Sequence, residues 1–287
     1  MMHDFHYRDR DFFLFHLKED VPIPEEFIPH THPQRAELLY FISGKCSCKV
    51  EEASFSLRPG DLILFAPNEI HQLEIDASVP YERICMNFLP ETLTKMDTSG
   101  ALHQLLNDRS IGRKRLFRPS DFEGASCTSY FYDMMEPTSN RHLTVLANMI
   151  IILQKLSIVY ANSPKNSITE SNLEQELVYY INQHLDRDLT LEALCSEFYL
   201  SRAQLCRFFK DTLGTSIGKY INAKRMVHAQ KLILQGQKPT AVFHQCGYQN
   251  YTSFFRAYCK FFGHSPKEDA TNTSTPIPYN SIPIQRL

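Results

Sequence analysis

Short apolar runs separated by turn-forming residues occupy the first third of the chain. The runs are Phe12–Leu17, Leu38–Ile42, Cys46–Val50, Leu62–Phe65 and Ile84–Phe88. Between them stand Ser43-Gly44, the stretch Arg58-Pro59-Gly60-Asp61, and Pro67-Asn68. Strands this short, punctuated by Gly and Pro, are typical of an all-β barrel or sandwich. The pattern therefore predicts a β-barrel at the start of the chain.

The apolar period lengthens after Pro90, which predicts helices at 101–106, 122–135 and 143–160. In the last of these, apolar residues recur at alternating steps of three and four, as in a two-heptad seam. The seam residues are Leu146, Met149, Leu153, Leu156 and Tyr160. We interpret this seam as a dimer interface. The alternative is a helix that lies on its own barrel.

The length of 287 residues corresponds to two domains of about 100–200 residues each. The polar stretch 161–172 (ANSPKNSITESN) is typical of a linker between domains 1–160 and 173–270, and 271–287 is expected to be a loose tail. No run of 18 or more apolar residues is present, and the N-terminus is charged where a signal peptide is apolar. We therefore expect a cytoplasmic protein with no membrane partner.

The second half predicts a helix-turn-helix unit. Leu173, Leu177, Ile181 and Leu185 recur every four residues, and Thr190 and Ser201 are suited to begin the next two helices, Ser201 with Gln204 as a capping box. In the helix after Ser201, Leu205, Phe208 and Phe209 point inward. The outer positions are Arg202, Ala203, Cys206, Arg207 and Lys210. Two short helices with a basic outer face on the second are typical of a helix-turn-helix.

The same layout then recurs. Ser216 can cap a helix that runs to about Gln235, and a final helix follows Asn250. Phe254, Tyr258 and Phe261 form the inner face of that final helix. Its outer face carries Tyr251, Thr252, Ser253, Phe255, Arg256 and Lys260. Because the long helix spans about 30 Å and one turn of DNA about 34 Å, one chain could place two helices in successive major grooves.

The charge distribution supports a nucleic-acid partner. The whole chain carries 30 Lys and Arg against 32 Asp and Glu, a net charge of −2. Residues 1–169 carry 17 basic and 22 acidic residues, a net of −5, whereas 201–267 carry 11 basic residues and one acid, Asp211, a net of +10. A basic segment with interleaved aromatic residues is typical of polyanion binding, the alternative being a solvated basic face. The helix-turn-helix pattern favours the first interpretation.

The predicted barrel contains one candidate metal or ligand site. His30 and His32 would face the same side of an extended strand, and Glu37 and His71 follow. The stretch HTHPQRAELLYFISG resembles the first motif of the cupin fold, and His71 in PNEIH matches the last His of the second. Such residues suit a divalent transition metal. We favour the alternative, a metal-free shell that binds small organic molecules. Cys46 and Cys48 are interpreted as buried apolar residues and not as thiolate ligands.

The second half also resembles the AraC/XylS family of bacterial transcription regulators over residues 173–266. The residues that carry this resemblance are S-x-x-x-L-x-R-x-F-K at Ser201–Lys210, then Gly214, Tyr220, Arg225, Ala229, Leu232, Gly247, Tyr248, Asn250, Phe254, Arg256, Tyr258, Gly263, Ser265 and Pro266. The resemblance implies an α+β multidomain protein: a cupin-like barrel with following helices, then an all-α domain of two helix-turn-helix units joined by a long helix. It also implies a homodimer that answers a small-molecule effector and often activates transcription, with RNA polymerase as a further partner.

The resemblance also suggests roles for individual residues. Arg207 and Arg256 would contact bases or phosphates. Base-edge candidates are Ala203, Gln204 and Thr252, phosphate candidates are Arg202, Lys210 and Lys260, and Cys206, Asn250 and Tyr251 complete the DNA-facing set. Tyr220 and Arg225 are expected to be structural, and Phe208 and Phe254 core. The departures from the family pattern are Pro239, Phe243, Cys259 and Asp269-Ala270. They cast more doubt on the second unit than on the first.

Three functions compete on this sequence. The first is a ligand-responsive, sequence-specific DNA-binding regulator, not an enzyme and requiring no cofactor, that controls uptake or use of a small molecule such as a sugar. The second is a metal-dependent cupin enzyme with an accessory DNA-binding module. The third is a ligand-binding or dimerising module whose second DNA-binding unit has decayed, which Phe243 suggests. We favour the first, with effector binding acting on the DNA-binding domain through the linker.

Overall fold

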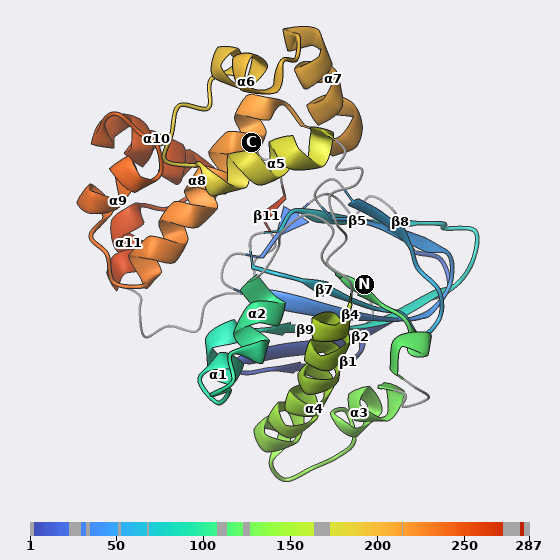
Figure 1. The fold of residues 1–287 in the computed structure, drawn as a ribbon. Helices are drawn as coiled ribbons and strands as arrows, with labels where there is room; N and C mark the ends of the chain where they lie inside the picture. Colours follow the sequence, from blue (N-terminus) through green and yellow to red (C-terminus); the bar gives the residue numbers. More distant parts are fainter. Residues whose placement is uncertain are drawn as a thin grey trace. The chain divides into compact units, whose positions relative to one another are not determined.

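The computed structural model describes residues 3–22, 30–32, 35–50, 53–67, 69–107, 114–122, 127–163, 173–213, 215–271 and 282–283. The chain forms two compact units, Met1–Ile28 with Gln34–Thr169, and Pro29–Pro33 with Glu170–Leu287. The first is rich in strands and the second is helical (Figure 1). The predicted α+β class is confirmed. The predicted 161–172 linker lies mostly outside the described residues, as does most of the predicted tail 271–287.

Two antiparallel sheets build the barrel. The larger has the order β1-β2-β9-β4-β7-β10 and the smaller β11-β3-β8-β5-β6. The strands of the larger sheet are β1 (His3–Arg8), β2 (Phe12–Glu19), β4 (Ala36–Ser43), β7 (Leu62–Phe65), β9 (Tyr81–Phe88) and β10 (Leu116–Phe117). Those of the smaller are β3 (His30–Thr31), β5 (Cys46–Val50), β6 (Ala53–Ser56), β8 (His71–Ile75) and β11 (Ile282–Pro283). The five predicted strand runs all lie in these strands.

The larger sheet is buried on both faces, because alternate residues of a strand point to opposite sides. Leu39, Phe41 and Cys85 pack inside the barrel with Cys48 of the smaller sheet. Leu38 and its neighbours on the other face pack under helices. Strand β4 is accordingly apolar at nearly every position, although a half-exposed strand would alternate.

Helices cover the outer face of the larger sheet (Figure 1). They are α1 (Pro90–Thr94), α2 (Ala101–Asn107), the 3-10 helix η2 (Pro119–Phe122), α3 (Thr128–Asp133) and α4 (Arg141–Asn162). The side chain of Asn140 caps α4 by accepting a hydrogen bond from the Leu143 amide, 3.1 Å away. The long apolar helix predicted for 143–160 is therefore present, with two more residues at each end.

The predicted dimer seam on this helix is wrong. Its residues face the barrel: Leu146 packs against the core from a partly buried position, and Met149, Leu153, Leu156 and Tyr160 are core residues that are almost completely buried. The outer face of the larger sheet is itself apolar, and the seam residues of α4 pack against it. The alternative interpretation, a helix lying on its own barrel, is the one the structure bears out.

The second unit consists of two helix-turn-helix pairs packed on one central helix. Its helices are α5 (Leu173–Gln183), α6 (Leu191–Phe198), α7 (Arg202–Leu213), α8 (Ile217–Leu234), α9 (Pro239–Gln245), α10 (Tyr251–Phe262) and α11 (Pro266–Thr271). The predicted caps at Thr190, Ser201 and Ser216 are confirmed, since each side chain accepts a hydrogen bond from the backbone amide three residues on. Asn250 caps α10 in the same way. The predicted stop at Gly214 lies outside the described residues.

Helix α8 holds the two pairs together. Tyr220 is fully buried and its hydroxyl bonds Asn182 of α5. The Arg225 guanidinium donates to the carbonyl oxygens of Leu185 (3.0 Å) and Arg187 (2.7 Å), which follow α5. These bonds tie α8 to the segment that follows α5. The expected structural roles of Tyr220 and Arg225 are confirmed.

One departure from the family pattern has a structural role. The Asp269 carboxylate of α11 accepts hydrogen bonds from the Tyr258 hydroxyl of α10, from Gln230 of α8 and from the His264 ring. Three segments of the second unit therefore meet at one side chain. Burial, followed by the hydrogen bond to Asp269, raises the pKa of Tyr258 far above its usual value, so this phenol remains a donor.

Candidate functional site

The outer face of α7 is polar and exposed. Leu205 and Phe209 are buried beneath it, as predicted, and Phe208 nearly so. The structure leaves all six α7 candidates exposed: Arg202, Ala203, Gln204, Cys206, Arg207 and Lys210. Because the buried residues recur every three or four positions, the six form the remaining face of the helix. Helix α7 thus offers a continuous surface with three basic side chains.

The outer face of α10 has the same construction. Phe254 and Tyr258 are fully buried, and Phe261 nearly so, in a core that includes Val242 and Cys246. The structure leaves Asn250, Thr252, Arg256 and Lys260 exposed and Tyr251 half-buried. Phe243 packs against this core as a partly buried residue. The second helix-turn-helix pair, α9 with α10, is therefore complete and packed.

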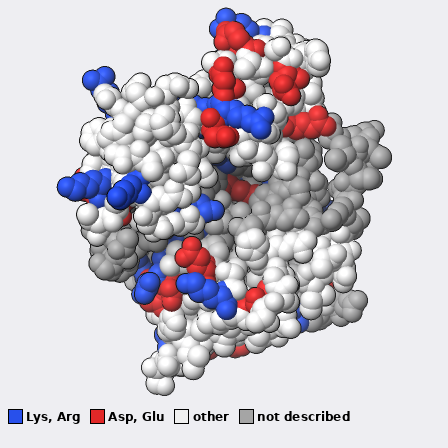
Figure 2. Space-filling view, turned by 60° about the vertical axis from the view of Figure 1, so that its left-hand side comes forward, with Lys and Arg blue, Asp and Glu red and all other residues white. Residues whose placement is uncertain are grey.

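The basic side chains of these faces are available to a partner. Among the described residues no carboxylate pairs with Arg207, Lys210, Arg256 or Lys260 within 4.0 Å. Arg202 lies 3.3 Å from Glu192, but both are well exposed, so this pair adds little stability. On the face drawn in Figure 2, basic side chains stand at separate points, and several of them lie beside acidic ones.

The turn before each outer helix contains a residue in the left-handed region. In the first helix-turn-helix pair this residue is Tyr199, with φ of 54° and its side chain 95 % exposed. In the second it is Gly247, with φ of 72°. Such residues reverse the chain after a helix, and Gly adopts the conformation without the steric cost that a side chain brings. The two turns thus share a left-handed backbone conformation, which Tyr199 adopts in one and Gly247 in the other.

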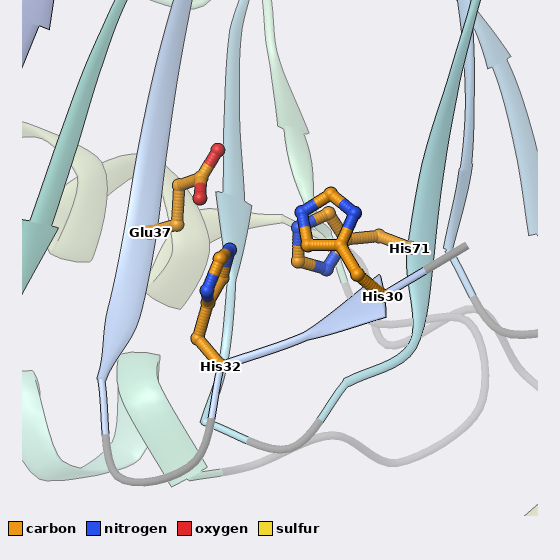
Figure 3. A group of neighbouring side chains, drawn as sticks. All are labelled: His30, His32, Glu37 and His71. Atoms are coloured by element: carbon orange, nitrogen blue, oxygen red, sulfur yellow. The ribbon is translucent and has the colours of Figure 1, made fainter. Parts of the chain in front are cut away.

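The four barrel candidates come together in space. One potential ligand atom from each of His30, His32, Glu37 and His71 lies within 4.8 Å of the others. Figure 3 shows the four side chains pointing toward a common space, Glu37 from β4, His71 from β8 and the other two from the segment of β3. The rings of His30 and His32 lie 4.9 Å apart, on the same side of their segment as predicted. His32, Glu37 and His71 are buried and His30 is half-buried.

The His71 ring is held in one orientation. Its Nδ1 donates to the carbonyl oxygen of Glu69, 3.0 Å away, so Nε2 is the acceptor nitrogen of the ring. The ring stacks on Phe65 with centroids 4.0 Å apart. The Glu69 carboxylate in turn lies 3.2 Å from the buried Arg115 guanidinium. A hydrogen bond from one ring nitrogen to a backbone carbonyl is the usual way in which a metal-binding His is oriented.

The thiols inside the barrel are buried. Burial raises the pKa of Cys46 to about 11 and that of Cys48 and Cys85 well above its usual value. Metals and electrophiles react with the thiolate, which burial disfavours. Cys46 and Cys48 are thus buried and neutral, as the sequence predicted, and all eight cysteines are free.

The sequence analysis missed Asn87. This residue stands opposite Glu37 in the β4–β9 register, so both side chains point into the barrel. Asn87 is fully buried, and neither its amide nitrogen nor its amide oxygen has a hydrogen-bond partner in the described part of the chain. An amide in this state costs free energy unless something binds it. A signal was present in the sequence: a lone Asn among the apolar residues of the strand YERICMNF.

Comparison with known proteins decides the family. The AraC-like ligand binding domain matches residues 23–113, and a helix-turn-helix domain matches residues 194–271. The chain is 34% identical over 240 residues to a probable transcriptional regulator, LumQ, of Photobacterium leiognathi, covering 83% of this chain and 88% of that protein. The chain belongs to the AraC family of transcriptional regulators.

Other matches have lower sequence identity. The arabinose operon regulatory protein of Escherichia coli is 26% identical over 236 residues, which is 79% of this chain and 77% of that protein. The crystal structure of ToxT from Vibrio cholerae O395 aligns with 93% of this chain and 99% of that one, at 14% identity and a TM-score of 0.37. The barrel cluster lies within the residues that match the AraC-like ligand binding domain. Helices α7 and α10 lie within the residues that match the helix-turn-helix domain.

Proposed function

We propose that this AraC-family regulator binds specific DNA sequences in response to a small molecule and controls the uptake or use of that molecule. The observation that carries the proposal is the pair of capped helix-turn-helix units on α8, each with an exposed arginine on its outer helix. A sugar is the proposed effector class, which rests on the name of the arabinose operon relative. The proposal includes action in the cytoplasm as a homodimer that contacts RNA polymerase, and no catalytic turnover.

In this proposal Arg207 and Arg256 read bases and their neighbours fix the register. A guanidinium pairs with two acceptors of guanine in the major groove. Lys210 and Lys260 lie one turn further along α7 and α10, where they would contact phosphates and set the position of each helix. The remaining base-edge candidates are the methyl group of Ala203, the amide of Gln204 and the hydroxyl of Thr252.

The salt dependence of DNA binding tests this function. We expect the affinity of the full chain for a fragment of its own promoter region to fall steeply with salt, by about 0.9 log units per log unit of salt for each phosphate neutralised. Fluorescence anisotropy with labelled fragments measures it. Equal affinity for every fragment together with a shallow salt slope would sink the proposal.

A second proposal concerns the effector site: the barrel cluster binds a divalent transition metal. The four potential ligand atoms lie within 4.8 Å of one another, so small side-chain movements would let one ion reach them with bonds of about 2.1 Å. Three imidazoles and a carboxylate are ligands that Zn²⁺, Ni²⁺ and Fe²⁺ accept. When bound, the ion would supply Lewis acidity and an anchor for an oxygen-bearing effector, and the Asn87 amide would bind the same effector beside Glu37.

Metal titration distinguishes this site from a metal-free shell and from an enzyme. We expect calorimetry with Zn²⁺ or Ni²⁺ to show one saturable site per chain, and the melting temperature to rise when the ion is in excess. His32→Ala should abolish both effects, whereas His103→Ala, an exposed histidine of the same unit, should change neither. Unaltered binding in His32→Ala would contradict the site. A metal-free protein that still binds its promoter would count against an enzyme.

A further inference from the structure

The turn that joins α6 to α7 (Figure 1) contains an exposed tyrosine in a strained backbone conformation. Tyr199 ends α6 with φ of 54° and ψ of 35°, and in the described part of the chain it is the one residue other than glycine with a positive φ. Its side chain is 95% exposed. The left-handed region brings the Cβ of an L-residue too close to a carbonyl oxygen, so a tyrosine here raises the free energy of the folded state.

The contacts of Tyr199 within the protein do not offset this strain. Its backbone amide donates to the Cys195 carbonyl oxygen at the end of α6, and a glycine would make the same bond. A buried tyrosine ring stabilises a fold through its large apolar surface, but a side chain that is 95% exposed buries almost none of it. Among the described residues no ring packs on Tyr199 and no group hydrogen-bonds its hydroxyl. Folding therefore does not account for a tyrosine at this position.

The second helix-turn-helix pair shows what packing requires at such a turn. Gly247 lies in the turn before α10, with φ of 72°. A Cβ there would lie 2.4 Å from the Arg225 guanidinium and 2.5 Å from the Leu185 carbonyl oxygen, so only glycine fits without displacing them. The turn at Tyr199, by contrast, is open to solvent. A glycine would suit both turns, and the first pair instead carries a side chain that faces outward, where a partner can reach it.

The residues beside Tyr199 point to DNA as that partner. Ser201 caps α7 two residues later, and Arg202 and Ala203 in the first turn of α7 are exposed members of the proposed DNA-facing set. Tyr199 continues this exposed surface beyond the start of α7. When a helix lies in the major groove, the sugar-phosphate strands that border the groove pass beside its ends. Tyrosine hydroxyls are among the groups that hydrogen-bond DNA phosphates, so a phosphate fits both the position and the chemistry of this side chain.

We propose that Tyr199 is a further DNA-binding residue, whose hydroxyl donates a hydrogen bond to a phosphate at the edge of the groove that α7 enters. The proposal rests on the proposed function and adds to it a contact that fixes the register of α7 without reading bases. The hydroxyl is an uncharged donor, so, unlike Lys210, it strengthens binding without neutralising a phosphate charge. Tyr199 thus increases the affinity for DNA while it destabilises its own turn.

Two substitutions at Tyr199 in the full chain separate the DNA contact from the backbone strain. We expect Tyr199→Gly to raise the melting temperature of the second unit by about 2–5 °C, because glycine adopts the left-handed region freely, and yet to weaken promoter binding about 5- to 10-fold. Tyr199→Phe keeps the ring and the conformation and removes only the hydroxyl, so the affinity should fall by a similar factor with the melting temperature unchanged.

The matched control is Tyr179→Phe, which removes the hydroxyl of a tyrosine on α5 that is 40% exposed and should change neither quantity. Fluorescence anisotropy and melting curves of the same preparations measure the two effects. Wild-type affinity in Tyr199→Phe would overturn the proposal. So would a lower melting temperature in Tyr199→Gly, since the side chain would then have a role within the fold.

The dependence of binding on salt and on sequence identifies the group that Tyr199 contacts. Tyr199→Phe should keep the wild-type slope of log affinity against log salt, whereas Lys210→Ala should make that slope shallower by about 0.9. Loss of a phosphate contact weakens binding to the promoter and to unrelated fragments equally, so the ratio of the two affinities should stay at its wild-type value in Tyr199→Phe. A changed ratio would mean that the hydroxyl contacts a base and would contradict the phosphate contact.

The same measurements distinguish failure of this contact from failure of the proposed function. A wild type that prefers its promoter, together with a Tyr199→Phe variant of equal affinity, contradicts the contact alone. If that variant also supports less transcription with purified RNA polymerase, the tyrosine serves a protein partner and the proposal is overturned. A wild type that does not distinguish its promoter from unrelated DNA contradicts the function itself.

Discussion

Replacing Arg207 by alanine is expected to weaken binding to the promoter by about 5- to 150-fold, since a bidentate arginine–guanine pair is worth about 1–3 kcal/mol. Arg207 is exposed on α7, and the residues buried beneath it fix the helix rather than the guanidinium. The loss should therefore appear in DNA affinity and not in thermal stability. Fluorescence anisotropy at fixed salt and a melting curve of the same preparation measure the two quantities.

Arg256→Ala is expected to cause a loss of similar size. The sequence alone left open that the second helix-turn-helix pair has lost its DNA-binding role, because Phe243 departs from the family pattern. In the structure, however, Phe243 packs against a filled core and α10 keeps its cap, its buried face and its exposed arginine. Lys231→Ala is the control, since it removes an exposed positive charge from α8 outside both outer helices. An Arg256→Ala protein with wild-type affinity would show that the second helix-turn-helix pair does not contribute to DNA recognition.

The second unit was predictable nearly in full because its signals are local. A Ser, Thr or Asn side chain that can accept a hydrogen bond from the amide three residues on marks a helix start within a few positions. The three caps predicted at Thr190, Ser201 and Ser216 are present in the structure. The 3.6-residue period then assigns the inner and outer faces. What it did not disclose is that Asp269, a departure from the family pattern, binds three segments together. That role depends on residues far apart in the chain.

The barrel was predictable where its strands are apolar and not where they are half polar. Strand β8, HQLEI, and strand β1, HDFHYR, contain too few apolar residues to form a run, and only their neighbours in the sheet define them. The prediction of a dimer seam on α4 was wrong for the opposite reason. Both of its faces are apolar, and periodicity within one helix cannot say which face the barrel takes. The four residues of the barrel cluster were found by motif, but Asn87 needed the β4–β9 register that sets it beside Glu37.

Three glycine-to-alanine variants should separate backbone conformation from steric contact in the second unit. Gly218 lies within α8 with open space around it, Gly236 has φ of 93° and open space, and Gly247 has φ of 72° and close neighbours. A Cβ at Gly247 would meet the Arg225 guanidinium and lie 2.5 Å from the Leu185 carbonyl oxygen. These are the groups whose hydrogen bond ties α8 to the segment after α5.

We expect Gly218→Ala to stabilise the unit by about 0.5–1 kcal/mol, because alanine is the better helix former. Gly236→Ala should cost about 1–2 kcal/mol for its left-handed backbone. Gly247→Ala should cost this plus about 1–3 kcal/mol of overpacking, and it should weaken DNA binding by displacing α9 and α10 from α5. Urea denaturation followed by far-ultraviolet circular dichroism measures the free energies. Equal losses for Gly236→Ala and Gly247→Ala would mean that the turn yields without disturbing Arg225, and that the two helix-turn-helix units are not held together through it.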